Sequence, residues 1–94
     1  MSQDQTRINL GNMASNLKHI AMFLADDKWQ LKLPRIKKFL EVTKVVYFQT
    51  KIDKKSNLFK FFENYLNKET INNKDFAEES LYFSVRFQNL AKII

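Results

Sequence analysis

Three lysines spaced by sevens form the clearest chemical pattern in this sequence. On an α-helix Lys37, Lys44 and Lys51 would drift by only about 20° per step, because seven residues make nearly two turns. They would form a single stripe roughly 20 Å long, which matches several phosphates of an extended nucleic-acid strand. The chemistry expected of such a stripe is the neutralisation of phosphate charge.

The stripe lies inside a basic block. Residues 28–60 hold ten basic and two acidic side chains, a net charge of +8, whereas the rest of the chain holds six basic and eight acidic ones, a net charge of −2. A basic block between mildly acidic ends indicates one face that binds a polyanion. The candidate nucleic-acid contacts are Lys28, Lys32, Arg35, Lys37, Lys38, Lys44, Phe48, Lys51, Lys54 and Lys55. With a single Arg among them, contact with the backbone is favoured over base reading.

Phe48 is an aromatic residue among these lysines. It lies about 120° around a helix from Ile36, which belongs to the apolar arc, so its ring could stack on a base. Alternatively, Phe48 and Val45 contact another helix or subunit, and the lysines simply cover a solvated helix face. The sequence leaves both alternatives open.

Residue types suited to catalysis are scarce. His19 is the only imidazole, and neither a second ligand nor a nucleophile accompanies it. The adjacent carboxylates Asp26 and Asp27, like Glu78 and Glu79, would point about 100° apart on a helix, so neither pair need converge on one site. Glycine-rich phosphate loops and hydrolase motifs are missing, and so is Cys. We predict a protein that is not an enzyme, with no cofactor, no metal site and no small-molecule substrate.

The elements that position these residues are expected to be helices. One Gly and one Pro among 94 residues leave little material for the turns of an all-β fold. We predict an all-α fold: a single domain over residues 1–94, built as a four-helix bundle with short connections after a loose lead-in at 1–7. The expected helices are 9–25, 34–53, 57–68 and 75–94. Pro34 marks the second start, and Asp75 with Glu78 suggests a capping box at the fourth.

Two segments also have strand character. Residues 81–87 alternate apolar and polar side chains, and residues 45–48 are β-prone. Helices are favoured at both places because the wider windows keep the 3.6-residue period. On the fourth helix, Leu81 and Val85 lie almost opposite the core stripe. They indicate either a central helix packed on two sides or a subunit interface.

Residues 31–46 resemble a stretch in the small, all-helical subunits of CRISPR-Cas effector complexes of the Cascade and Csm type. The matching segment reads Leu31-Lys-Leu-Pro-Arg-Ile-Lys-Lys-Phe-Leu40 and continues to Val45 and Val46. It covers about 15 of the 94 residues. It departs from the family pattern in the lead, where Lys32 and Leu33 replace a Thr pair, and at Lys37, which stands for an Arg.

The resemblance implies a non-catalytic bundle present in several copies within a crRNA-guided complex. Its basic face would hold the backbone of the target or displaced strand, as a single strand or a heteroduplex, and other subunits would be its protein partners. Lys37 is the only site residue that the resemblance carries over. With a polar N-terminus and no apolar run long enough to span a bilayer, a cytoplasmic location is expected.

A protein of another class also fits the basic surface. The alternative is a helical protein-interaction module, such as a bacteriocin-immunity-like bundle or a phage inhibitor. Its basic side would meet an acidic partner or an anionic membrane surface.

Overall fold

The computed structural model describes residues 3–94 and confirms the all-α prediction. Within that range it contains four α-helices, one 3-10 helix and no strand. The elements are α1 (Gln3–Leu24), η1 (Trp29–Lys32), α2 (Leu33–Gln49), α3 (Asn57–Leu66) and α4 (Asn73–Ile93). Both segments with strand character are helical, in α2 and α4.

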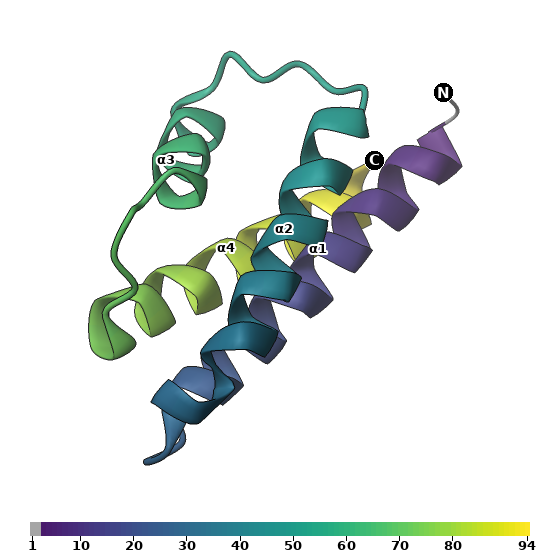
Figure 1. Cartoon of the computed structure of the whole chain (residues 1–94). Helices are drawn as coiled ribbons and strands as arrows, with labels where there is room; N and C mark the ends of the chain where they lie inside the picture. The colour runs from purple at the N-terminus through teal and green to yellow at the C-terminus, as the bar shows by residue number, and fades with distance from the viewer. Residues whose placement is uncertain (1–2) are drawn as a thin grey trace.

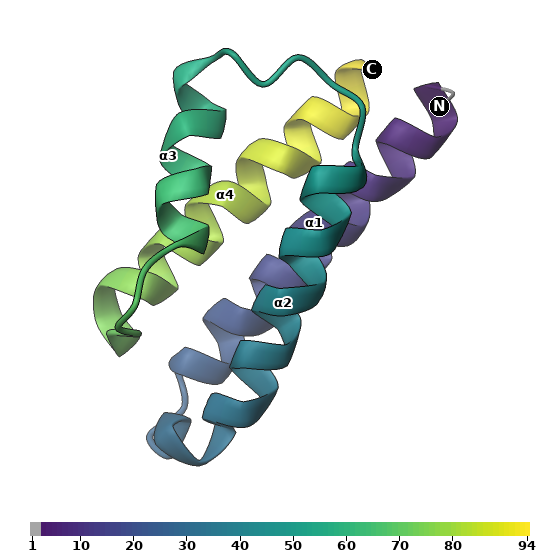
Figure 2. The same ribbon diagram turned by 45° about the horizontal axis from the view of Figure 1, so that its top comes forward.

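The bundle is organised around α1, which contacts α2 on one side and α4 on another. Both neighbours run antiparallel to α1, while the short α3 packs on the outside after the linker 50–56 (Figures 1 and 2). Two polar contacts join α1 to α4. Ser84 Oγ donates to the Ala14 carbonyl at 2.6 Å, and the Arg7 guanidinium donates to the Ile94 carbonyl. The first and last helices therefore form the central pair.

The start of α1 corrects the prediction of a loose lead-in. Residues 3–7 are helical, and residues 1–2 of that lead-in lie outside the described residues. Thr6, Asn9 and Leu10 are buried in this first part of α1. The helix extends because its opening turns pack against the bundle, and two of the packed side chains are polar.

The end of α2 also differs from the prediction. The helix stops at Gln49 rather than at 53, because Thr50 adopts an extended backbone conformation with φ −77° and ψ 121°. Thr50 is buried, and its Oγ donates to the Val46 carbonyl at 2.7 Å. The buried and hydrogen-bonded Thr50 thus marks the end of the helix, and Lys51 lies in the linker.

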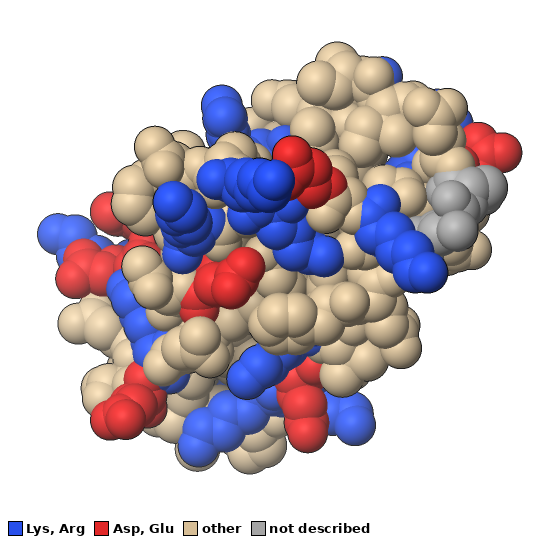
Figure 3. Space-filling model, turned by 90° about the horizontal axis from the view of Figure 1, so that it is seen from above, with Lys and Arg blue, Asp and Glu red and all other residues tan. Residues whose placement is uncertain are grey.

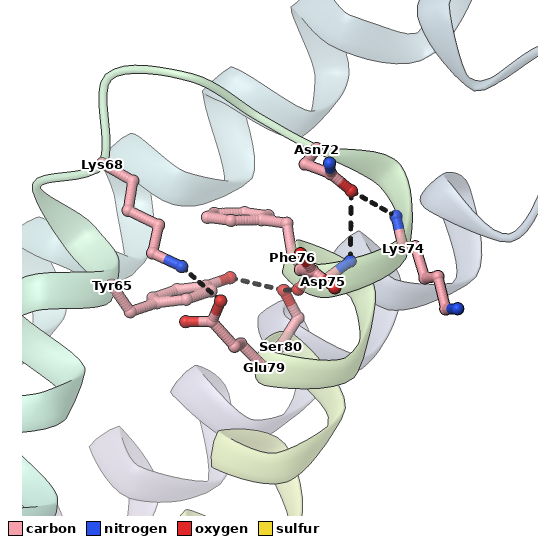
Figure 4. A network of polar contacts seen from close by, with 8 residues as sticks. All are labelled: Tyr65, Lys68, Asn72, Lys74, Asp75, Phe76, Glu79 and Ser80. Atoms are coloured by element: carbon pink, nitrogen blue, oxygen red, sulfur yellow. Dashed lines mark hydrogen bonds and ion pairs between the residues drawn. The ribbon is translucent and has the colours of Figure 1, made fainter.

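The start of α4 is set by Asn72 and not by the predicted capping box at Asp75 and Glu78. Asn72 Oδ1 accepts hydrogen bonds from the backbone N–H of Lys74 at 2.9 Å and of Asp75 at 3.2 Å (Figure 4). This satisfies two of the free donors at the helix start. Asp75 therefore lies in the first turn, where its negative charge interacts favourably with the helix dipole.

An aromatic cluster holds α3 against the rest of the bundle. Phe62 is fully buried, and its ring lies 5.1 Å from Tyr47, 5.0 Å from Phe83 and 4.7 Å from Phe87, measured between ring centroids. Tyr65 stacks on Phe76 at 4.4 Å. Edge-to-face and stacked rings at these distances add stability beyond the area that they bury.

Polar contacts reinforce the same junction. The Tyr65 hydroxyl lies 2.6 Å from Ser80 Oγ, which itself donates to the Phe76 carbonyl at 2.7 Å, so Tyr65 is the donor in the first contact (Figure 4). Lys68 and Glu79 form an ion pair beside it. In the described part of the chain, every buried side-chain nitrogen and oxygen has a hydrogen-bond partner.

A Gly11→Ala substitution in α1 is expected to stabilise the protein by up to about 1 kcal/mol, because glycine carries an entropic cost in a helix. A Cβ atom added at Gly11 would meet nothing within 4 Å, and its backbone has no positive φ. Urea unfolding followed by circular dichroism measures the change. A loss of stability would contradict this account of the Gly11 surroundings.

Candidate nucleic-acid interface

The structure places most of the predicted cations at the surface of α2 and of the segments on either side. Arg35, Lys37, Lys38 and Lys44 are exposed on α2. Lys28 is exposed just before η1, and Lys51 and Lys55 are exposed in the linker 50–56. We call these seven residues the basic surface.

The lysine stripe itself is shorter than predicted. Lys37 and Lys44 share one side of α2, about 10 Å apart along its axis. Lys51 does not continue the stripe, because α2 ends at Gln49. In the part of the chain that the structure describes, none of the three forms an ion pair with a carboxylate. Their charges therefore face solvent without internal neutralisation.

Two of the predicted contacts are engaged within the protein. Lys32 Nζ pairs with Asp26 Oδ2 at 2.9 Å and lies 5.7 Å from the centre of the Phe23 ring. Lys54 Nζ donates to the Thr50 carbonyl at 2.6 Å and lies 5.1 Å from the centre of the Tyr47 ring. Both ammonium groups therefore have partners within the chain.

Phe48 is exposed over 58% of its surface. It lies about 40° around the helix from Lys44. Its ring packs edge-on against Tyr47, with 5.0 Å between centroids. Tyr47 is buried and donates to Glu63 Oε2 at 2.6 Å, and burial, followed by this hydrogen bond, raises the pKa of the Tyr47 hydroxyl. Phe48 is thus held on one side by a fixed ring while much of its surface stays open.

The basic surface is not uniformly positive. Viewed onto the end of the bundle that carries the linker 50–56, Lys and Arg side chains are spread over the face with carboxylates among them (Figure 3). Glu41 is exposed on α2, and Asp53 is exposed in the linker, where its Oδ1 accepts from the backbone N–H of Lys55 at 3.0 Å. The basic surface therefore has a net positive charge, but carboxylates lie among its lysines.

The groups considered for catalysis are dispersed. His19 stacks on Phe39 with 5.5 Å between centroids, and its Nδ1 lies 2.8 Å from the Ser15 carbonyl. Because a carbonyl only accepts, Nδ1 carries the proton in this contact. Across residues 3–94, no three His, Cys, Asp or Glu side chains are grouped so as to hold a metal ion.

Asp26 has a structural role at the end of α1. Its Oδ1 accepts from the backbone N–H of Lys28 at 2.7 Å. The Lys32 ammonium, followed by this backbone donor, lowers the pKa of the Asp26 carboxyl. At the other carboxylate pair, Glu79 bonds to Lys68 while Glu78 is exposed. In each pair, one carboxylate is therefore engaged by a lysine.

Leu81 and Val85, the predicted interface residues, are only about half covered within the chain. They are 50% and 47% exposed on α4. The alternative in which another helix of the chain covers Leu81 and Val85 is therefore wrong, although α1 and α3 both pack on α4. Their role as a subunit interface stays a prediction.

The fold and surface define a small all-α protein with an exposed basic helix. The sequence matches no protein-family model, no curated protein and no solved structure. None of the helices within residues 3–94 has the length and apolar composition needed to cross a membrane. The resemblance at residues 31–46 thus has no support from these comparisons.

Proposed function

We propose that this protein binds the backbone of a nucleic acid through the basic surface of α2 and the linker, without catalysing a reaction. The observation that supports it is the exposure of Lys37, Lys44 and Lys51 with no carboxylate paired to any of them among residues 3–94. Phosphates would supply the missing counter-charges. Each contact with a phosphate releases bound counterions, so the affinity should fall steeply with salt concentration.

Phe48 favours a single strand as the ligand. A duplex hides the faces of its bases, whereas a single strand offers them for stacking on an aromatic ring. Phe48 exposes its ring beside Lys44 on the same side of α2. A strand that lies along the lysines could therefore place one base on this ring.

Within this proposal, the protein acts as a small subunit of a larger cytoplasmic assembly. The resemblance of residues 31–46 to small subunits of CRISPR-Cas effector complexes is what supports a crRNA-guided complex, where the strand held would be the target or the displaced strand. The all-α fold agrees with such a subunit.

The test changes Lys37, Lys44 and Lys51 together to Glu. Binding of a fluorescent single-stranded oligonucleotide is measured by anisotropy against salt concentration. We expect the affinity at low salt to fall at least tenfold, and the slope of log K against log salt to decrease by about 2, since each lost phosphate contributes about 0.7. DNA and RNA oligonucleotides are tested separately.

The matched control changes Lys18, Lys74 and Lys92 to Glu. These three lysines are exposed on α1 and α4. Both variants lower the net charge from +6 to 0, so a loss caused by net charge alone would be equal in the two. Equal losses, or unchanged binding in the first variant, would refute the site.

The second candidate function is binding of an acidic protein through the same helix. It is supported by Val42 and Val45, which are exposed beside Lys38 and Glu41 in a shallow groove on α2. Apolar residues rimmed by charge are typical of protein interfaces. This protein would form a stoichiometric complex that Val45→Ser weakens, and it would show no salt-linked binding to oligonucleotides. Binding to anionic vesicles instead would indicate a membrane surface as the partner.

A further inference from the structure

The outer face of α4 is apolar at its centre. Leu81, Tyr82 and Val85 are each about half exposed there, whereas Phe83 and Phe87 are buried on the inner side. At about 100° per residue, Tyr82 and Val85 lie within roughly 60° of each other and point away from the core. Three large side chains left open within five residues are unusual for a helix that needs one apolar face.

Shallow grooves extend this apolar surface to both sides. One is lined by α4 alone, with Leu81, Tyr82 and Val85 between Glu78 and Arg86. Tyr82 also lines a groove that reaches the exposed Phe61 of α3. Arg86 also lines a third groove, which reaches Ile93. Because neighbouring grooves share residues, they form one continuous surface along α4.

The charges on this face are divided between the two halves of the helix. Asp75 and Glu78 lie before the apolar centre, and Arg86 and Lys92 lie after it. None of the four forms an ion pair among residues 3–94. Lys74 reduces the negative charge of the first half without cancelling it.

We infer that a second copy of this chain packs antiparallel along α4, which makes the protein a homodimer. In an antiparallel pair, the acidic half of each helix lies against the basic half of the other, so the favourable contact occurs twice, as two-fold symmetry requires. A parallel pair would place Glu78 against Glu78 and Arg86 against Arg86. The face is complementary to itself in one orientation only.

The spacing along α4 fits such a contact. Exposed residues recur at alternating steps of three and four, as in a helix that packs against another helix; they are Asp75, Glu78, Tyr82, Val85, Asn89 and Lys92. Tyr82 and Val85 stand at the middle, so the two copies bring their apolar centres together. One helix pair is a small interface, and the dimer is expected to form only at high protein concentration.

Sedimentation equilibrium of the full chain tests this. The apparent mass of the unaltered protein should approach twice 11.2 kDa as concentration rises. Glu78→Lys and Arg86→Glu should each give monomers, because each variant opposes like charges across the pair. An equimolar mixture of the two variants should recover the dimer, since the charges then match again. The two residues are eight apart, too far to pair with each other on one helix.

Two further variants separate self-association from a general effect of added charge. Val85→Glu should give monomers, and Val45→Glu, at a similarly exposed valine on α2, should leave the dimer unchanged. Circular dichroism verifies that each variant is folded. A monomer at every concentration of the unaltered chain, or a mixture of the charge variants that stays monomeric, would overturn the inference. Oligonucleotide binding is not needed for either result.

Discussion

Phe62→Ala is expected to lower the free energy of unfolding by about 3–5 kcal/mol, the usual cost of removing a buried aromatic ring. The ring is fully buried and contacts aromatic rings of α2, α3 and α4. Its removal leaves a cavity where α3 meets the other helices. Since a small domain has about 5–15 kcal/mol of stability in total, the loss is a large part of it. Urea unfolding followed by circular dichroism measures the change.

The neighbouring Phe61 provides a matched control. It is 60% exposed, whereas Phe62 has no exposed surface. Phe61→Ala removes the same ring from the same helix, yet it should change the free energy of unfolding by no more than about 0.5 kcal/mol. Phe62→Leu should fall between the two, because it fills part of the cavity. Equal effects at positions 61 and 62 would mean that α3 is turned differently around its axis.

The second large effect is expected at alkaline pH. Burial raises the pKa of the Tyr65 hydroxyl well above its ordinary value of 10.0, and the Glu79 charge adds to this. Below pH 10 the hydroxyl is protonated in both the folded and the unfolded chain, so its contribution is fully present. Above pH 10 only the unfolded chain loses the proton. The free energy of unfolding should therefore fall by up to about 1.4 kcal/mol per pH unit from this group.

Tyr65→Phe tests the alkaline effect directly. The substitution removes the titrating hydroxyl and keeps the ring that stacks on Phe76. In urea unfolding between pH 10 and 12, the number of protons released on unfolding should decrease by about one. Tyr47, whose pKa burial also raises, should keep a further part of the pH dependence. An alkaline slope identical to that of the unaltered protein would show that Tyr65 does not titrate as argued.

Local patterns predicted where the helices lie, but less well where they end. Pro34 located the start of α2 to within one residue, because a missing N–H is tolerated only in the first turn. The opening of α1 was missed, since its buried residues include Thr6 and Asn9, which a count of apolar positions ignores. The end of α2 was missed because a bond from the Thr50 side chain to its own helix, rather than a Gly or Pro, accompanies the stop.

The candidate site also has features that the sequence predicts and features that it does not. Spacing alone could place Lys37 and Lys44 on one side of a helix, since both belong to a regular element. It could not show that the Lys54 ammonium lies over the Tyr47 ring, because Lys54 belongs to the linker, whose path a helical period does not predict. Nor could it find the bond between Tyr47 and Glu63, whose residues lie on different helices. Contacts between elements depend on how the elements pack.

The pairing of α1 with α4 has a consequence for how the chain folds. Ala14 and Ser84, which meet at the centre of this pair, are 70 residues apart in sequence. Closing so long a loop costs entropy before any contact compensates it, and such distant contacts slow folding. On the ribosome, the apolar side of α1 emerges first and stays partly uncovered until α4 has been synthesised. Completion of the core therefore waits for the last helix of the bundle.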